Sequence, residues 1–551
     1  MLNDAAADSE RARYALRSLL STLGLPFEFI PNLDEAIATL TDRQAHLVIG
    51  EADPARIACL ARKTAVVVVP GPNLPMGIGG ERSVPDPRQI RVLEEPIGAG
   101  YLVRVAGDLI GSTFALIART EEYAVSTRDE HDRFRWIDSG MEPAELAARP
   151  LVSEYAQLLL TCLKEACVQA GVPLVRKEFW PLGRPMAGCL THDVDVVRRG
   201  RLPRGIAIRD VKGALSAAAR GRLGRAAAQV TSIARTAARD QDPYWTFDRI
   251  SAIETRHGYR STYYFMTGNH HPEDVSYDLD RSPMAGLLQL LKSSGDEIGL
   301  HGSYSSYKDP ELLKSMKEKL ERHFGLPVFG HRNHYLRFRV PESWNAQEAG
   351  GFSYDATLGF HDREGFRGSH AFPFHPYDLA GDRTLDLLEI PLAVMDVTLF
   401  KYRHLQFNKA LEAVSNVLDQ TRSVHGLVTL LWHNHTFFDH EYPGSGKLYE
   451  ATLDWLAEGD AYVATAQEID SWWRAREAVK LAPLDESSNG WRMECPREIA
   501  GLVLRVGLPN PRSSLRVRGQ VPLSVRRDGT DYLLEFGLLA AGFSLVVEYT
   551  E

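Results

Sequence analysis

The chain has 551 residues, more than one ordinary domain contains, so we expect two or three domains. A hydrophobic content of 44% and a charged content of 25% are typical of a globular protein. The net charge of −9 excludes general nucleic-acid binding, because that function needs a basic surface, and we expect no nucleic-acid partner.

The first ten residues contain neither a basic segment nor an apolar one, so we expect no secretory signal. No apolar stretch reaches the roughly 18–20 residues that a membrane span requires. The five cysteines are scattered and lack C-x-x-C spacing. Together these patterns predict a cytoplasmic protein with no integral membrane segment.

Residues 1–180 are predicted to form an N-terminal α/β accessory domain. Helical periodicity covers Tyr14–Leu23 and Leu151–Ala170, and β-rich runs cover Pro26–Ile30, His46–Gly50 and Ala65–Val69. We find no catalytic constellation in this region.

Residues 181–478 alternate β-rich runs with helical ones, such as Glu311–His323 and Phe407–Val424. Repeated β-then-α units imply a parallel sheet with helices outside it, so we predict an α/β fold with a seven-stranded (β/α) barrel. The seven predicted strands are Ala187–Leu190, Ser261–Met266, Glu297–Leu300, Val328–His331, Gly351–Ala356, Leu387–Met395 and Gly426–Leu431.

An insert rich in Ala and Arg, residues 198–241, interrupts this pattern, and its composition favours helix. One interpretation is a basic helical arm that binds an anionic substrate, such as a pyrophosphate-linked sugar, or makes peripheral contact with a membrane surface. The alternative is a solvated helical excursion from a barrel loop.

Residues 479–551 are predicted to form a small antiparallel β domain, because short β-rich runs alternate with turns that contain Pro and Gly. The runs are Ile499–Val506, Ser514–Val517, Pro522–Val525, Tyr532–Phe536 and Ser544–Tyr549.

The most informative stretch is 187–195, an apolar run that ends in two carboxylates, Asp193 and Asp195. In a strand, alternate side chains lie on one side, so both carboxylates can share a cation. One carboxylate could then bind a divalent metal while the other takes a proton from metal-activated water. Because acidic loops also contain isolated D-x-D sequences, the downstream residues decide between these interpretations.

Residues that follow successive strands of a parallel β/α barrel meet at one face, which carries the chemistry. All but His46 and His131 of the 18 histidines lie between His192 and His440. The strand-end positions hold a set rich in metal-binding and acid–base side chains: His192, Asp193, Asp195, His301, Ser305, Arg332, His334, Tyr335, Asp396, His433 and His435.

Four of these motifs resemble those of the polysaccharide deacetylases, the NodB-type fourth family of carbohydrate esterases. Thr191–Asp195 corresponds to the first motif in its D-x-D form, and His301–Ser305 to the metal-binding second motif. Arg332–Tyr335 corresponds to the third motif, and Leu431–His433 to the strand-end Leu-x-His. The motifs occur in the family's order across residues 187–475. Two further stretches, Asp242-Pro-Tyr-Trp and Thr120-Glu-Glu-Tyr, resemble a divergent branch with an extra N-terminal domain.

The resemblance implies metal-dependent N-deacetylation of an acetamido sugar, with Zn²⁺ as the expected metal and Co²⁺ or Ni²⁺ as alternatives. Carried over by position, Asp193 is the general base, and Asp195 and His301 are metal ligands. Arg332 would orient Asp193, and the backbone N–H of Tyr335 would help to stabilise the oxyanion.

The same carry-over makes His433 the general acid that protonates the leaving amine. Asp396 would fix the tautomer of His433 and raise its pKa. An unprotonated amine is a poor leaving group, so this acid is as necessary as the base.

The sequence departs from the family at the third ligand, because Ser305 stands where motif two has its second histidine. A hydroxyl is a weak Zn²⁺ ligand compared with imidazole. His334, which stands where the family has proline, is the preferred replacement. His192, or a water or Ser305 that completes an open site, are the alternatives.

We expect the substrate to contact His435, Trp432, Tyr304 and Ser305, although large aromatic residues more often pack in a core. The predicted function is hydrolysis of the acetamido group of an N-acetylated sugar in a cell-envelope glycan or its nucleotide- or lipid-linked precursor. Two alternatives stay open. One is a barrel hydrolase that cleaves a non-sugar C–N bond, and the other is a catalytically degenerate glycan-binding module.

Overall fold

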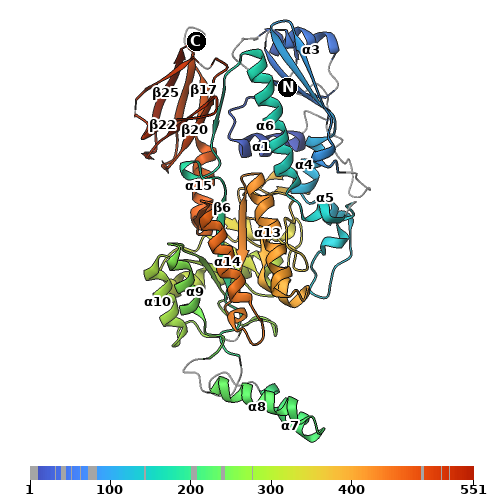
Figure 1. Ribbon diagram of the computed structural model, residues 1–551, viewed down its shortest axis with the longest axis vertical. Helices are drawn as coiled ribbons and strands as arrows, with labels where there is room; N and C mark the ends of the chain where they lie inside the picture. Colours follow the sequence, from blue (N-terminus) through green and yellow to red (C-terminus); the bar gives the residue numbers. More distant parts are fainter. Residues whose placement is uncertain are drawn as a thin grey trace.

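The computed structural model has a central parallel sheet with β-containing regions packed at one end of it (Figure 1). One hydrophobic core cluster extends from Ala12 in the first helix to Tyr549 in the last strand, so these regions share a continuous core. The structure describes residues 10–30, 33–38, 45–50, 53–62, 64–71, 84–141, 144–199, 208–237, 242–275, 277–484, 489–510, 512–519 and 521–550.

The central sheet has the order β13-β10-β9-β8-β7-β6-β15-β14, and β16 also pairs with β6. Neighbouring strands are parallel throughout, as the repeated β-then-α pattern predicts. The strands are β6 (Ala187–Asp193), β7 (Thr262–Phe265), β8 (Glu297–Gly302), β9 (Gly330–Asn333), β10 (Tyr354–Asp355), β13 (Leu388–Glu389), β14 (Leu392–Met395), β15 (Leu427–Leu431) and β16 (Tyr462–Ala464).

The α/β class and the seven predicted strand runs are confirmed, although the run 387–395 divides into β13 and β14. Pro391 lies between these two strands, and a proline cannot donate to a strand ladder. β13 pairs with β10 whereas β14 pairs with β15, so the two edge strands of the curled sheet are neighbours in the chain. Complete closure into a (β/α) barrel stays a prediction.

Helices that follow the strands pack beside the sheet. In α11 (Pro310–Phe324) the Asp309 side chain accepts the Leu312 N–H, and Gly325 ends the helix at a φ of 73°. Its buried side chains recur at helical spacing, which explains why the sequence pattern located this helix. The others are α9 (Phe247–Arg256), α10 (Met284–Ser294), α12 (Glu342–Ala349), α13 (Phe407–Ser423), α14 (Ser445–Glu458) and α15 (Ala466–Ala478).

The N-terminal region contains a four-stranded sheet of order β1-β2-β4-β3. The predicted strand Pro26–Ile30 is wrong: these residues pair with no strand, and Phe27 packs against Phe29 instead. A β-rich composition forms a strand only where a sheet edge is within reach. The elements are β1 (Ala45–Ile49), β2 (Ala65–Val69), β3 (Val92–Ile97), β4 (Gly100–Val105), α1 (Glu10–Leu23), α2 (Leu33–Ala38), α3 (Pro54–Ala61), α4 (Leu109–Ile117), α5 (Thr120–Ala124) and α6 (Leu151–Ala170).

The C-terminal region contains two four-stranded sheets, β17-β18-β25-β21 and β22-β23-β20-β5. Strand β5 (Leu174–Lys177) precedes the central sheet in the chain, yet it pairs with β20 (Val503–Gly507). The remaining strands are β17 (Lys480–Pro483), β18 (Gly490–Cys495), β19 (Ile499–Ala500), β21 (Ser514–Arg518), β22 (Ser524–Asp528), β23 (Asp531–Glu535), β24 (Leu538–Leu539) and β25 (Phe543–Thr550).

The Arg-rich insert forms a helical hairpin, α7 (Ile208–Ala219) and α8 (Leu223–Ala237), that projects away from the body (Figure 1). Its predicted helical character is therefore confirmed. Arg201, Arg204 and Arg239 lie outside the described residues. Among the helices that the structure describes, none is long and apolar enough to cross a membrane.

Candidate metal centre

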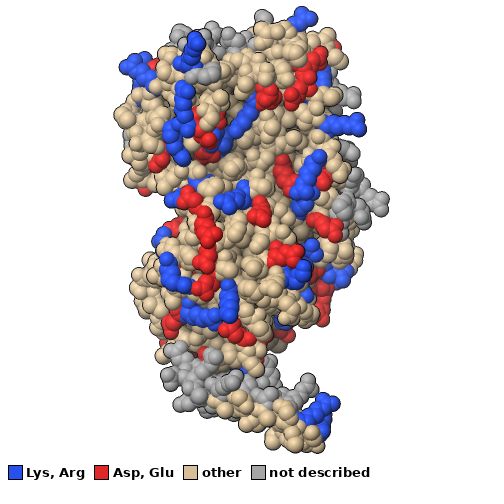
Figure 2. Space-filling model, viewed as in Figure 1, with Lys and Arg blue, Asp and Glu red and all other residues tan. Residues whose placement is uncertain are grey.

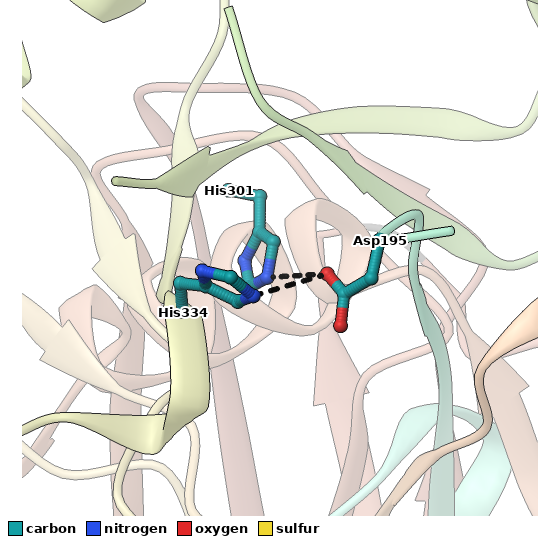
Figure 3. Close-up of side chains that lie close together, drawn as sticks. All are labelled: Asp195, His301 and His334. Carbon is teal, nitrogen blue, oxygen red and sulfur yellow. Dashed lines mark ion pairs between the residues drawn. The ribbon is translucent and has the colours of Figure 1, made fainter. Parts of the chain in front are cut away.

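Three potential metal ligands meet beyond the carboxyl ends of β6, β8 and β9. Asp195 follows β6, His301 lies in β8, and His334 follows β9 (Figure 3). One ligand atom from each lies within 4.8 Å of the other two. Asp195 Oδ1 is 3.0 Å from His301 Nε2 and 3.8 Å from His334 Nε2. Ligand atoms of a tetrahedral Zn²⁺ site lie roughly 3.4 Å apart, so this spacing suits a cation.

Unpaired atoms in this cluster support the same conclusion. Asp195 Oδ1 and His301 Nε2 are buried, and neither makes a hydrogen bond although they are close together. Buried polar atoms normally have partners. The two atoms instead point toward a common position, as ligands of one ion do.

The ring of His301 is held in the tautomer that a metal ligand requires. Its Nδ1 donates to the backbone carbonyl of Arg332 at 3.0 Å, which leaves the Nε2 lone pair directed at the site. Burial lowers the pKa of His301, but Asp193 and Asp195 outweigh it and raise that pKa. The site therefore stabilises positive charge at Nε2.

Asp195 is ionised in this setting. Burial raises its pKa, but His334, His301 and His433 outweigh burial and hold the pKa far below its usual range. The residue thus presents a carboxylate, which is the form that binds a cation.

The sequence analysis missed Asp274, whose Oδ1 is 3.7 Å from Nδ1 of His334. The Ser303 hydroxyl and the Tyr304 N–H donate to this buried carboxylate at 2.7 and 2.8 Å. Burial raises the pKa of Asp274, but His334 and Ser303 lead the contacts that lower it well below its usual range. A carboxylate behind a metal-binding histidine orients the ring. The one sequence signal that could have identified Asp274 was its position in the loop that follows β7.

Asp193 lies beside the three potential ligands and is paired with Arg332. Its Oδ2 is 3.8 Å from His301 Nε2, and its Oδ1 is 3.4 Å from Arg332 Nη1. The same Nη1 donates to the Thr191 hydroxyl, and Nε donates to the carbonyl of Ala356. Both charged groups are almost fully buried, so the position of the Asp193 carboxylate is fixed.

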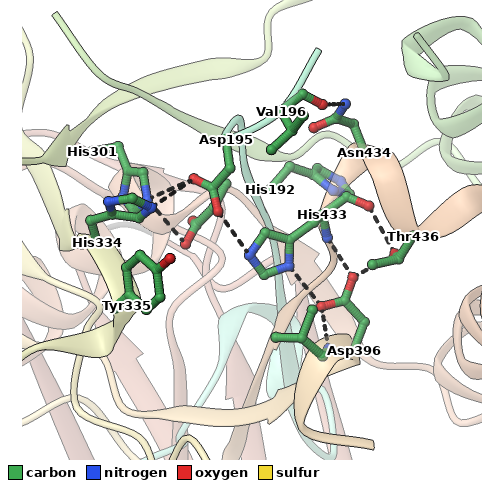
Figure 4. Close-up of polar contacts among 12 residues, drawn as sticks. His192, Asp195, Val196, His301, His334, Tyr335, Asp396, His433, Asn434 and Thr436 are labelled. Atoms are coloured by element: carbon green, nitrogen blue, oxygen red, sulfur yellow. Dashed lines mark hydrogen bonds and ion pairs between the residues drawn. The ribbon is translucent and has the colours of Figure 1, made fainter. Parts of the chain in front are cut away.

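His433 and Asp396 form a pair on the other side of Asp195 (Figure 4). His433 Nε2 is 3.5 Å from Asp195 Oδ2, and its Nδ1 is 2.7 Å from Asp396 Oδ1. The Thr436 hydroxyl and the His433 N–H also donate to Asp396. Burial lowers the pKa of His433, but Asp396 and Asp195 outweigh it and raise that pKa to about 9. The imidazole therefore carries a proton at neutral pH.

His192 and Trp432 are held in the core rather than exposed to the site. His192 is fully buried, and its two ring nitrogens contact the Trp432 carbonyl and the Glu254 carboxylate. No nitrogen of His192 is left for a metal. Trp432 is fully buried too, and its indole N–H donates to Ser445. The predicted stacking of Trp432 on a substrate is therefore wrong, because strand alternation turns its ring inward.

The other predicted contact residues lie at different depths. Tyr304 is half-buried and contacts His131 and Tyr335, and the ring of His435 lies 5.3 Å from that of His433. Ser305 is exposed, and its backbone N–H donates to the Ser303 hydroxyl at 3.2 Å.

Comparison with known proteins separates the chain into two parts. Residues 1–168 match the model of a family described as a family of unknown function (DUF7033). No curated protein matches the chain.

Among solved structures, the chain is similar to a protein assigned as a polysaccharide deacetylase from Mycobacterium smegmatis, with 20% identity and a TM-score of 0.36. A protein assigned likewise from Pseudomonas aeruginosa PAO1 has 13% identity and a TM-score of 0.36. Each match covers 54% of this chain and 93% of the other. A CE4 family pseudoenzyme from Bacillus anthracis has 10% identity and a TM-score of 0.28, over 52% of this chain and 66% of that one. All of these scores are low, so the reaction of this chain has to be inferred from its own side chains.

Proposed function

We propose that the protein is a metal-dependent deacetylase that hydrolyses the acetamido group of an N-acetylated sugar. One observation carries the proposal. Three potential ligand atoms gather within 4.8 Å, with a buried carboxylate, Asp193, on one side and on the other an imidazole, His433, whose pKa the neighbouring Asp396 raises. Amide hydrolysis needs an acceptor for the proton of water and a donor to the leaving amine, and this arrangement provides both.

Asp195, His301 and His334 would hold the cation, for which Zn²⁺ suits a set of two imidazoles and one carboxylate. When bound, the cation polarises the amide carbonyl and lowers the pKa of a nearby water. Asp193 accepts a proton from the attacking water as the new C–O bond forms. Arg332 holds that carboxylate in place.

His433 gives its Nε2 proton to the nitrogen of the tetrahedral intermediate, and the C–N bond then breaks to release acetate and a free amine. Asp396 holds the opposite ring nitrogen, so only Nε2 faces the site. The backbone N–H of Tyr335 would stabilise the oxyanion. His435 and Tyr304 would contact the sugar.

We further propose that the catalytic unit is the complete (β/α)7 barrel of residues 181–478, and that residues 1–180 and 479–551 are accessory domains. The 388–395 segment supports closure, since it pairs with β10 at its start and with β15 at its end.

The helical hairpin suggests a substrate carried on a nucleotide or a lipid in the cytoplasm. Exposed apolar side chains, Leu215, Leu223 and Val230, lie along it, and exposed Arg220 and Arg222 lie in its turn. Figure 2 shows basic side chains at the tip of the projecting hairpin. Residues 198–241 hold ten arginines and one lysine but two aspartates, whereas the chain as a whole has a net charge of −9. A basic amphipathic hairpin can bind an anionic membrane surface peripherally.

Metal analysis and acetate release test the proposed reaction. The purified protein would be stripped with a chelator, reloaded with Zn²⁺, Co²⁺ or Ni²⁺, and incubated with UDP-N-acetylglucosamine, chitooligosaccharides and cyclic amides. We expect one metal per chain, and acetate and free amine in equal amounts from an acetamido sugar.

Two other results would replace the proposal. Turnover of cyclic amides alone would indicate a hydrolase of non-sugar C–N bonds. A protein that binds no metal and releases no acetate would indicate a glycan-binding module.

A further inference from the structure

Two consecutive residues next to His334 have an unusual backbone. Tyr335 has a φ of 62° and Leu336 a φ of 52°, both in the left-handed region that residues other than glycine rarely adopt. Such conformations persist only where surrounding contacts impose them. The contacts that hold this turn therefore control the directions of the two peptides that flank Tyr335.

Two of those contacts come from the N-terminal region, about 200 residues earlier in the chain, while the Tyr335 hydroxyl donates to Glu273 in the central region. Arg133 Nη1 donates to the Tyr335 carbonyl at 3.2 Å and to the Tyr402 hydroxyl at 3.1 Å. In the opposite direction, Arg337 Nε donates to the backbone carbonyl of His131 at 2.8 Å. The turn at 335–336 is thus tied on both sides to residues 131–133.

Residues 131–133 are themselves held in one conformation by Asp129. This carboxylate accepts the backbone N–H groups of His131 and Arg133 at 3.0 and 2.8 Å, and the Nε–H of Arg133 at 2.8 Å. Arg133 is only 4% exposed, and a buried guanidinium with three fixed contacts loses little further freedom.

His131 extends the same segment to the rim of the metal centre. Its Nδ1 is 3.1 Å from the Tyr304 hydroxyl, and its ring centroid is 4.6 Å from that of Tyr335. The N-terminal region therefore supplies part of the wall next to the ligand His334.

We propose that residues 129–133 complete the active site, with Arg133 as a positioning residue that fixes the Tyr335–Leu336 peptide through the Tyr335 carbonyl. The region that matches a family of unknown function then has a role: by holding the Tyr335 carbonyl it restrains the φ and ψ of Tyr335, and with them the direction of the oxyanion-binding N–H in the preceding peptide. The kinetic part of this inference rests on the proposed deacetylase reaction, whereas its structural part does not.

Arg133→Ala in the full-length, Zn²⁺-loaded protein tests the inference, with Arg135→Ala as the matched control. Arg135 pairs with Asp138 at 2.7 Å and is 41% exposed. For Arg133→Ala we expect unchanged Zn²⁺ stoichiometry, an unchanged KM, and a kcat about a hundredfold lower on the best acetamido sugar. Hydrogen–deuterium exchange across residues 333–340 should be roughly tenfold faster, because the turn loses its restraint.

A kcat and an exchange rate equal to those of Arg135→Ala would overturn the proposal and leave residues 129–133 as a packing contact. If Arg133→Ala does not fold, Arg133→Lys replaces it. Lysine cannot reproduce the forked hydrogen bonds of the guanidinium group. We therefore expect a lower kcat with an unchanged KM, as for Arg133→Ala, but with a smaller loss of kcat. Wild-type kcat and exchange in Arg133→Lys would also overturn the proposal. A wild type that is inactive on every sugar would contradict the proposed reaction, while the exchange measurement would still test Arg133.

Discussion

Two clusters of charged side chains in this protein differ in the partners that surround each charge. One contains Glu122 of α5, which pairs with Arg119 at 2.9 Å and with Arg367 at 2.6 Å. The other is the candidate metal centre, where Asp195 Oδ1 and His301 Nε2 form an ion pair at 3.0 Å. Glu122, Arg119, Arg367 and His301 are nearly inaccessible, whereas the Asp195 side chain is 18% exposed.

The arginine–glutamate cluster is structural. Burial raises the pKa of Glu122, but Arg367 and Arg119 outweigh it and lower that pKa to about 2. Both carboxylate oxygens accept from these guanidinium groups, which links the N-terminal region to the central one. Paired charge of this kind stabilises a domain contact, whereas the candidate metal centre brings three potential ligand atoms within 4.8 Å of one another.

Removing a ligand histidine tests this distinction most severely. For His301→Ala and His334→Ala we expect metal affinity to fall by more than the roughly 10–100-fold that loss of an outer contact costs. Turnover should be lost with the metal. Zn²⁺ titration with a competing chelator measures the affinity. His323→Ala is the control, because this histidine pairs with Asp280 away from the site. Unchanged affinity in His334→Ala would move the third ligand elsewhere.

Asp193→Asn separates chemistry from metal binding within the same cluster. The amide keeps the shape of the carboxylate but cannot accept the proton of water, so kcat should fall by about 10²–10⁴ while Zn²⁺ remains bound. Acetate release and metal content are measured on the same sample. If this variant retained most of its activity, the base assignment would be wrong.

Glu122→Gln tests the structural cluster. It leaves Arg367 buried without a counterion and Arg119 paired with Glu121 alone, which costs about 3–5 kcal/mol of folding stability. Urea unfolding measures the loss, and kcat per folded molecule should not change. A variant as stable as the wild type would show that the pairing contributes nothing to stability.

The effect of Glu122→Gln also depends on pH. Because the folded-state pKa of Glu122 is lowered to about 2, its stabilising contribution is complete above its ordinary pKa of about 4.5. The contribution is lost as the pH falls from there toward 2. The stability difference between wild type and variant should therefore shrink in acid, and a constant difference would contradict the assigned pairing.

Asp274→Asn should have the smallest effect, since this residue acts on the metal only through His334. We expect roughly 10–100-fold weaker Zn²⁺ binding with the fold intact. Asp278→Asn is the matched control, because Asp278 lies in the same loop and pairs with the exposed Arg281. Equal affinities in the two variants would remove Asp274 from the metal centre.

Much of the central region could be predicted because its elements are set by local patterns. Buried parallel strands are continuous apolar runs, and the helices between them carry apolar residues at helical spacing. The predicted strand at residues 26–30 was wrong because a strand forms only beside the edge of another strand, and sequence composition does not show whether such an edge is near. The predicted substrate contact of Trp432 was wrong because an aromatic side chain at a strand end can face inward or outward, and only packing decides which.

The sequence by itself determined the order of the motifs, the central parallel sheet and the residue types that gather at its carboxyl edge. Regular periodicity and strand-end position are enough for that. Only the tertiary structure brought Asp274 to His334 and Arg133 to Tyr335. Contacts between side chains far apart in the chain depend on how loops and regions pack, and no local pattern records that packing.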